Sequence, residues 1–217
     1  NVLEYTVINY VFFIIFLLAL ANGFNFIDGM NGLISFNSFG IIFSLLFLSY
    51  IVNDSYLIFY LFPLLIFLLI FIIFNFPLGR IFLGDTGAYF LGLYFGVFAL
   101  IFFGNHSSIS SWNILIIFFY PIAEVIYSFF RKALQKKSPF QPDRFHLHLK
   151  IYDLLKLKLN SSILANNFTT LSISIFFILP PFLLPFIYDN NIMIFSSFIL
   201  LTLIYLFFNV FTYRTDN

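Results

Sequence analysis

The chain has 217 residues, of which 62% are hydrophobic, 24% aromatic and only 9% charged. A soluble domain carries about 25% charged residues, so the composition excludes a soluble surface and predicts an integral membrane protein. Cysteine is absent, which excludes disulfides and thiolate metal sites.

Seven segments meet or approach the length of about 20 apolar residues that a spanning helix needs. None alternates with the two-residue period of a membrane β-strand, so we expect an all-α, polytopic membrane protein with a single transmembrane domain over residues 1–217. The sixth segment contains Pro180, Pro181 and Pro185 and is expected to be kinked or broken. The expected helices lie near residues 5–21, 33–52, 56–74, 87–103, 113–130, 168–188 and 192–211, and a basic loop covers residues 131–167.

The distribution of cations predicts the orientation of these helices. Eight of the ten Lys and Arg residues lie between Arg131 and Lys158, and the positive-inside rule places that loop in the cytoplasm. Counting helices outward puts residues 22–32 and 75–86 on the same side. The connections at 53–55, 104–112 and 189–191 fall on the other side, and they contain no Lys or Arg. The sequence therefore predicts that the polar clusters described next share one membrane face.

The first polar cluster follows the first expected helix. Asn22, Asn25 and Asp28 are spaced three residues apart, so a helix would carry them on one side. Two amides and a carboxylate in that arrangement suit a metal ion or a polar ligand, and the neighbouring glycines allow a close approach. The alternative is a helix end followed by Gly-rich turns, in which Asn and Asp act as caps.

The second polar cluster, residues 76–87, separates two long apolar runs. Arg80 and Asp85 either pair with each other or face an anion and a cation, respectively. Asp85 has a further interpretation as the N-cap of the helix that follows. Ionisable groups at such a seam in a membrane protein favour a functional role.

The third polar cluster lies in the basic loop. In an extended backbone Arg144, His146 and His148 lie on one face, and such a row of donors suits phosphate oxygens. A zinc site and a loop resting on anionic lipid are the alternatives. From Leu147 onward the apolar spacing predicts an amphipathic helix on the membrane surface, with Lys150 on its polar face.

Glu124 is the one carboxylate that falls well inside an expected span. An intramembrane carboxylate is a functional candidate, and the alternative is a pairing role with Arg80 or a cation of another helix.

Taken together, four motifs in this order resemble the polyprenyl-phosphate N-acetylhexosamine-1-phosphate transferases, which are of the glycosyltransferase family 4 type. The matching residues run from Asn22 to His148, about two thirds of the chain. The motifs are Asn22-x-x-Asn25-x-x-Asp28-Gly29-x-Asn31-Gly32-Leu33, Phe82-Leu83-Gly84-Asp85-Thr86-Gly87, Pro121-x-x-Glu124 ahead of Arg131, and Pro142-Asp143-Arg144-x-His146-x-His148.

The resemblance implies a membrane enzyme that uses Mg²⁺ or Mn²⁺. Such an enzyme moves N-acetylhexosamine-1-phosphate from a UDP-N-acetylhexosamine to undecaprenyl phosphate and releases UMP. It works at the cytoplasmic face of a bacterial plasma membrane, in the first step of a lipid-linked glycan pathway such as lipopolysaccharide synthesis. The expected partners are the two substrates and the lipid bilayer, with a homodimer as a further candidate and no nucleic acid.

The resemblance also implies roles for individual residues. Asp85 is expected to be a metal ligand, with Asn25 beside it. The catalytic set is Asp28, Asp85, His146 and His148. The substrate-binding set, to which we add Arg80, is Asn22, Asn25, Gly29, Asn31, Arg80 and Arg144.

The chain departs from the family pattern at three points. Many relatives have Asp where Asn31 stands, and many have a further His at the position of Leu149. The family also has an adjacent acidic pair before these motifs, whereas this chain contains no adjacent carboxylates. We therefore expect the chain to be the C-terminal portion of a larger enzyme and to be inactive by itself.

Two other function classes compete with the enzyme. A secondary transporter or channel would place ionisable residues along a path near the bilayer midplane. A non-catalytic scaffold would use the basic loop to dock a partner or anionic lipid. The gathering of acids and bases at one predicted face favours the enzyme.

Overall fold

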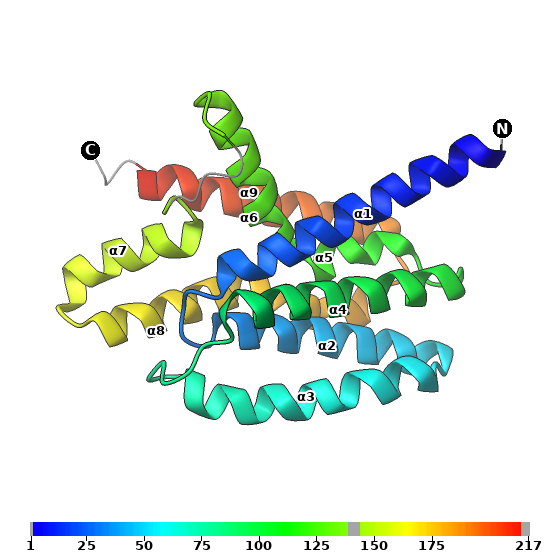
Figure 1. Cartoon of the computed structure of the whole chain (residues 1–217), viewed down its shortest axis with the longest axis horizontal. Coiled ribbons are helices and arrows are strands. Elements are labelled where there is room, and N and C mark those ends of the chain that lie inside the picture. Colours follow the sequence, from blue (N-terminus) through cyan, green and yellow to red (C-terminus); the bar gives the residue numbers. More distant parts are fainter. Residues whose placement is uncertain (1, 139–143, 214–217) are drawn as a thin grey trace.

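The computed structural model describes residues 2–138 and 144–213, and within these ranges the chain is helical and contains no strand. Six helical segments of the described residues, one of them the irregular segment Ser162–Phe186, are long and apolar enough to cross a membrane, or seven if one bent pair is counted as a single span. The prediction of an all-α, multi-pass membrane protein is therefore confirmed. Figure 1 shows the long helices running roughly side by side, with the turn between α3 and α4 at the same end as α7.

Four long helices form the first half of the chain, and the second half is more broken. The helices are α1 (Val2–Ile27), α2 (Leu33–Val52), α3 (Ser55–Asn75), α4 (Gly84–Asn105), α5 (Ile114–Ile117), α6 (Phe119–Leu134), α7 (Leu147–Leu159), α8 (Ser162–Ile173) and α9 (Asn191–Tyr213). A short 3-10 helix, η1 (Ser111–Asn113), precedes α5.

The fifth expected helix, 113–130, is not one straight helix. It is divided at Phe118 into α5 and α6, whose axes differ by 78°. Pro121 explains the break, because its ring has no N–H to donate and would clash with the carbonyl of Ile117 in a continuous helix.

The sixth expected helix is irregular, as its prolines predict. After α8 the backbone becomes a π-helix, η2 (Ser174–Ile178), and then a 3-10 helix, η3 (Pro180–Phe186). The prolines remove backbone donors there, and Ser44 of α2 donates its hydroxyl to the carbonyl of Pro181 at 3.1 Å.

The expected basic loop 131–167 is largely helical instead. It includes the last turn of α6, all of α7 and the start of α8. Leu147 and Ile151 of α7 are buried, so tertiary packing stabilises this helix. The placement of Lys150 on a polar face is wrong: its ammonium group is buried and donates to Asn209 Oδ1 of α9 at 3.0 Å.

Helix α1 packs between α4 and α6, and glycines permit the close approach. A Cβ atom added at Gly92 of α4 would lie 2.6 Å from the carbonyl oxygen of Leu20, and one added at Gly23 of α1 would lie 2.9 Å from the Cβ of Pro121. The end of α1 is thereby held against the start of α4 and against α6 at once.

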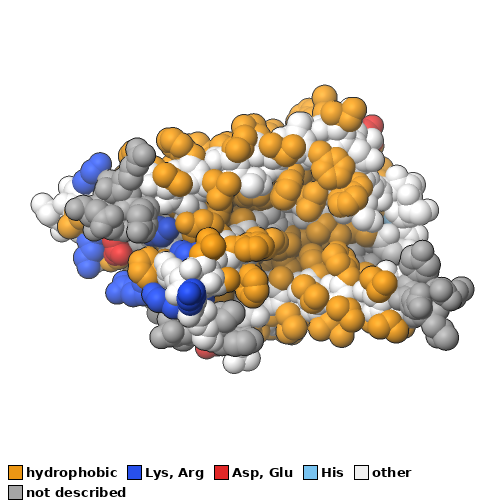
Figure 2. Space-filling model, turned by 90° about the horizontal axis from the view of Figure 1, so that it is seen from above, with side chains coloured by type: hydrophobic (Ala, Val, Ile, Leu, Met, Phe, Trp, Pro, Cys, Tyr) orange, Lys and Arg blue, Asp and Glu red, His pale blue; other side chains and the backbone are white. Residues whose placement is uncertain are grey.

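Contacts between connections confirm which polar segments share an end of the bundle. The predicted outer connections meet one another, because His106 bonds Asp54 at 2.8 Å and Ser110 bonds Asn191 at 2.6 Å. The segments that carry the three polar clusters meet at the opposite end. Figure 2 shows Lys and Arg side chains gathered at one end of a surface that is otherwise largely apolar.

The packing of α1 against α4 predicts different effects for two glycines of α4. Gly92→Ala should lower the unfolding temperature in detergent, because overpacking costs about 1–3 kcal/mol and the atoms in the way are backbone. Gly104→Ala is the matched control, since no atom lies within 4 Å of its added Cβ. Equal unfolding temperatures for the two variants would contradict this packing.

Candidate active site

The first part of the candidate site joins the end of α1 to the start of α4. Asn25 donates its amide to Asp85 Oδ1 at 3.0 Å, across 60 residues of sequence. Asp85 lies inside the first turn of α4, whose N-cap is Leu83. The interpretation of Asp85 as an N-cap is therefore wrong, and its exposed carboxylate is available at the mouth of the site.

Asp28 follows directly after α1 and faces the same helix start. Burial raises the pKa of Asp28 from 3.8 to about 6, the backbone N–H groups of Gly84 and Leu83 oppose this effect, and the negative charge of Asp85 adds to it. Its Oδ1 is buried and has no hydrogen-bond partner among the described residues. Asp28 and Asp85 therefore both lie at the start of α4, close enough for their charges to interact.

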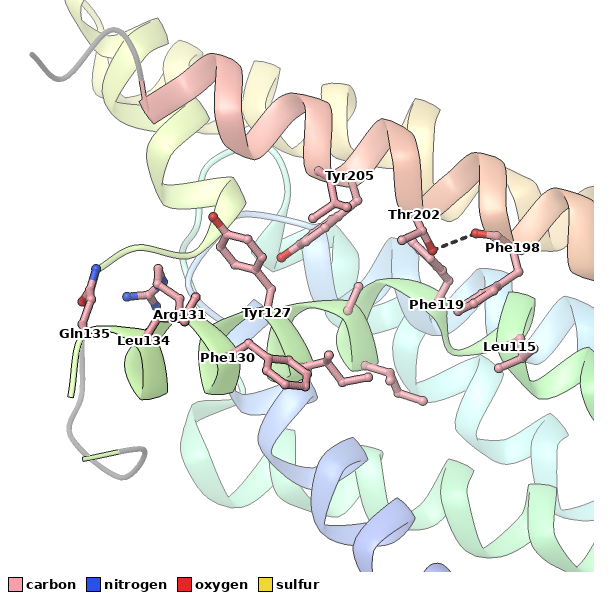
Figure 3. Close-up of a pocket in the computed structure, with 14 residues that line it drawn as sticks. Leu115, Phe119, Tyr127, Phe130, Arg131, Leu134, Gln135, Phe198, Thr202 and Tyr205 are labelled. Atoms are coloured by element: carbon pink, nitrogen blue, oxygen red, sulfur yellow. Dashed lines mark hydrogen bonds between the residues drawn. The ribbon is translucent and has the colours of Figure 1, made fainter. Parts of the chain in front are cut away.

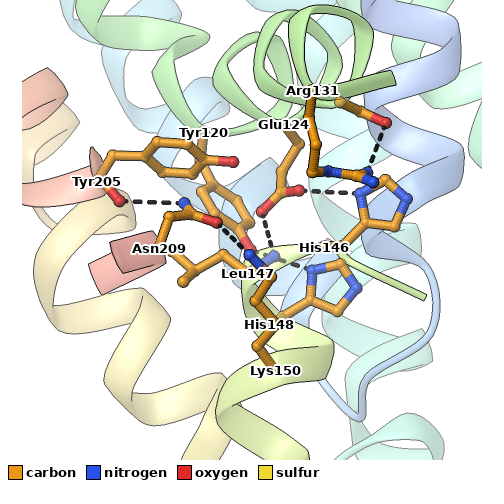
Figure 4. Close-up of polar contacts among 10 residues, drawn as sticks. Tyr120, Glu124, Arg131, His146, Leu147, His148, Lys150, Tyr205 and Asn209 are labelled. Atoms are coloured by element: carbon orange, nitrogen blue, oxygen red, sulfur yellow. Dashed lines mark hydrogen bonds and ion pairs between the residues drawn. The ribbon is translucent and has the colours of Figure 1, made fainter. Parts of the chain in front are cut away.

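The second part of the site is built around Glu124 of α6, which is only 1% exposed. Its Oε2 lies 2.9 Å from His146 Nδ1, and its Oε1 accepts from the backbone N–H of Leu147 at 3.1 Å. Figure 4 shows these contacts. The partner of Glu124 is thus an imidazole of the third cluster, so the suggested pairing with Arg80 is wrong.

His148 lies beside His146 in a parallel arrangement. The ring centroids are 5.7 Å apart and the ring planes differ by 6°, so both imidazoles lie on one side. The extended backbone on which we based that expectation does not continue to His148, which lies in the first turn of α7. The Nδ1 atom of His148 is 3.1 Å from the hydroxyl of Tyr120. Burial lowers the pKa of His148 to about 4, with Glu124 opposing and His146 adding to the effect, so His148 is neutral near pH 7.

The two parts of the site meet at consecutive residues of α1. The Phe26 ring lies 4.4 Å from the His146 ring, measured between centroids, while the preceding residue, Asn25, bonds Asp85. The amide–carboxylate pair and the imidazole pair therefore occupy one end of the bundle and flank the end of α1.

The remaining predicted site residues lie around this centre in different environments. Asn22 is exposed and its amide donates to the Leu18 carbonyl of its own helix at 2.8 Å. Gly29 faces open space. Arg80 and Arg144 are exposed, and the binding roles of these four residues stay predictions.

Asn31 is buried and holds two connections together. Its side chain donates to the Pro77 carbonyl at 2.9 Å, and its backbone N–H donates to Asn166 Oδ1 at 2.7 Å. Its assignment to substrate binding stays a prediction, and the contacts add a structural role.

Sequence reasoning missed Asn75, which is fully buried at the end of α3. Its side chain accepts from Gly32 N–H at 2.6 Å and donates to the Ile81 carbonyl at 2.7 Å. The sequence signal that could have revealed it is a single amide at the end of a largely apolar helix of 21 residues.

An apolar cavity of about 570 Å³ lies beside this site, between α6 and α9. Figure 3 shows its lining, with Arg131 and Gln135 at the end nearest the basic segment and aromatic side chains further along. Tyr127 belongs both to the cavity wall and to the surroundings of Lys150, whose ammonium lies 5.3 Å from the centre of the Tyr127 ring.

The raised pKa of Asp28 predicts a pH-dependent stability. A carboxyl with a raised folded-state pKa favours folding in its protonated form, and that contribution is lost as pH rises through about 6. Asp28→Asn, neutral throughout, should gain more unfolding temperature relative to the wild type at pH 7.5 than at pH 4, in detergent with a chelator. Asp189→Asn, at the opposite end of the bundle, should leave the pH dependence unchanged. A parallel pH dependence of wild type and Asp28→Asn would contradict the burial of this group.

Residues 1–103 match the family model described as glycosyl transferase family 4. Over 138 residues the chain is 31% identical to the undecaprenyl-phosphate alpha-N-acetylglucosaminyl 1-phosphate transferase of Thermotoga maritima, a match that covers 64% of this chain and 41% of the relative. It is 32% identical over 84 residues to a probable undecaprenyl-phosphate N-acetylglucosaminyl 1-phosphate transferase of Bacillus subtilis, covering 37% of this chain and 23% of the relative.

The chain thus spans less than half the length of either relative. No solved structure matches it. The resemblance predicted from the motifs is confirmed, since residues 1–103 match the model of glycosyl transferase family 4.

Proposed function

We propose that the complete protein transfers N-acetylhexosamine-1-phosphate from a UDP-N-acetylhexosamine to undecaprenyl phosphate and releases UMP. The observation that carries the proposal is the meeting of separate motifs at one end of an apolar bundle. Asn25 bonds Asp85 while the next residue, Phe26, lies against His146. The names of the two relatives support the same reaction.

The reaction brings two anions together, since a phosphate monoester attacks a diphosphate. Unit charges 4 Å apart repel by about 4 kcal/mol at an effective dielectric constant near 20. The active site must therefore supply positive charge and hydrogen-bond donors. The exposed guanidinium groups of Arg80 and Arg144 are the candidates for the positive charge. The imidazoles of His146 and His148 lie together, and each can donate a hydrogen bond or accept a proton.

The oxygen-rich part of the site suits a divalent cation. Mg²⁺ and Mn²⁺ prefer carboxylate and carbonyl oxygens. Asp85 offers an exposed carboxylate, and Asp28 has a buried oxygen without a partner among the described residues. The Asn25 amide donates through nitrogen and keeps its oxygen as an acceptor. No group of three His, Cys, Asp or Glu side chains forms a metal site within the described ranges, so phosphate oxygens and water would complete the coordination.

Asp85 and Asn25 would hold the ion, which when bound neutralises phosphate charge. Asp28 has a pKa of about 6, near the second pKa of a phosphate monoester. It is therefore suited to exchange a proton with the acceptor phosphate near neutral pH.

The surroundings of the site suit a lipid acceptor at the cytoplasmic face of a bacterial plasma membrane. The site lies at the basic end of the bundle, where Lys and Arg gather, and such segments favour the cytoplasmic side. The apolar cavity between α6 and α9 suits an isoprenoid tail, whose phosphate would remain among the polar residues.

The proposal predicts that Asp85→Asn removes most of the activity of the complete protein, because a neutral amide no longer complements the ion. UMP release and lipid-linked product should be measured with a panel of UDP-sugars. The control is Lys136→Gln with Lys137→Gln, two exposed cations outside the site, which should retain activity. A docking scaffold predicts the opposite pattern, and unchanged product formation by Asp85→Asn would refute the assignment.

If the isoprenoid tail lies in this cavity, a change in the cavity should affect the KM for the lipid and not the KM for the UDP-sugar. Ala123→Phe fills the cavity and should raise the KM for undecaprenyl phosphate several-fold while leaving the KM for the UDP-sugar unchanged. Ile70→Phe, on the exposed face of α3, is the control for added bulk. Equal lipid KM values for the two variants would exclude this cavity as the tail site.

A further inference from the structure

Glu124 makes specific hydrogen bonds, but the proposed reaction assigns it no role. It is buried inside α6, yet both of its oxygens bond the segment that begins at His146. None of its hydrogen bonds within the described residues goes to Asn25 or Asp85, so any effect of Glu124 on substrate must pass through the groups that it holds.

The contact with His146 decides where that imidazole carries its proton. A carboxylate only accepts hydrogen bonds, so the nitrogen that faces it must be an N–H. The 2.9 Å contact is to Nδ1. His146 therefore carries its proton on Nδ1, and Nε2 is the ring nitrogen that remains for a ligand.

The same face of α6 holds the second imidazole. Tyr120 and Glu124 are four residues apart, so they lie one above the other on the helix, and Tyr120 bonds His148 through Nδ1 as well. In Figure 4 both rings are held by Nδ1, and the other ring nitrogen of each is directed away from Glu124 and Tyr120. Phe26 of α1 packs against the His146 ring, on the side that leads to Asn25 and Asp85.

The second oxygen of Glu124 fixes the backbone. By accepting from Leu147 N–H it bonds an otherwise unpaired donor at the start of α7. His146 is the N-cap of α7 and His148 lies in its first turn. One carboxylate thus sets the ring of His146, the start of α7 and, through α7, the position of His148.

We infer that Glu124 is a positioning residue, which keeps the proton of His146 on Nδ1 and thereby leaves Nε2 unprotonated, able to take up the proton of a phosphate monoester bound at the Asn25–Asp85 end of the site. The inference rests on the proposed function for the identity of the ligand. The placement of the proton rests on the geometry alone.

Glu124→Gln tests this arrangement, because an amide cannot replace both acceptors. If its one oxygen accepts from Leu147 N–H, its NH₂ group faces His146 Nδ1 and forces the proton to Nε2. We expect kcat/KM for the UDP-sugar to fall about 10- to 100-fold, the range measured for groups that orient a ligating imidazole.

A double-mutant cycle separates positioning from general destabilisation. In a His146→Ala background, Glu124→Gln should cause little further loss, since it acts through the missing imidazole. The matched control is Asp54→Asn, which alters the carboxylate–imidazole pair with His106 at the opposite end of the bundle and should leave kcat/KM unchanged. Fully additive losses for Glu124→Gln and His146→Ala would overturn the inference.

Nitrogen NMR of the complete protein labelled with ¹⁵N-histidine gives a readout that needs no activity. The resonances of His146, assigned by their loss in His146→Ala, should report a protonated Nδ1 in the wild type. In Glu124→Gln the proton should move toward Nε2. A wild-type His146 protonated on Nε2 alone would overturn the inference. Absence of UMP release with every UDP-sugar would instead refute the proposed function, and the NMR result would still decide the role of Glu124.

Discussion

The close crossing of α1 with α4 is the constraint on which the candidate site depends. Gly92 lets the two backbones approach, and the approach brings Asn25 within 3.0 Å of Asp85 although 60 residues separate them. Without this crossing, Asp85 would be one exposed carboxylate at a helix start. With it, an amide and two carboxylates come together at one end of the helical bundle.

The two halves of the site have opposite environments, and the difference matches their proposed tasks. Asp85 is exposed and retains freedom to adjust to an ion or a phosphate. The other half is buried and consists of Glu124, His146 and His148, which are hydrogen-bonded to specific partners. The two imidazole rings also stack on each other. Buried polar networks of this kind rigidify when their members are satisfied. The chain thus combines an open oxygen-rich part with a rigid imidazole part.

The arrangement favours an enzyme over a transporter. A transport path would distribute ionisable groups toward the bilayer midplane. Here Glu124, the carboxylate furthest inside a span, is paired with His146 and belongs to the same end of the bundle as Asp28 and Asp85. The irregular helix from Ser174 to Phe186 follows from its prolines and packs against α2, so its form requires no transport mechanism.

Much of this protein follows from local pattern. Apolar runs of membrane length determine the long helices, and cation counts predict which connections share a face. The motifs indicate Asp28, Asp85, His146 and His148 as candidate site residues. Each of these signals lies within a short stretch of sequence. The sequence did not predict the 78° break at Phe118, the helix α7 as a packed element or the burial of Lys150. Only the tertiary structure decided that Glu124 pairs with His146, that Asn75 anchors the turn at Gly32 and that Asn25 meets Asp85. Those contacts join residues 22 to 60 positions apart, and their partners are selected by which helix faces pack together, a choice that no single stretch of sequence contains.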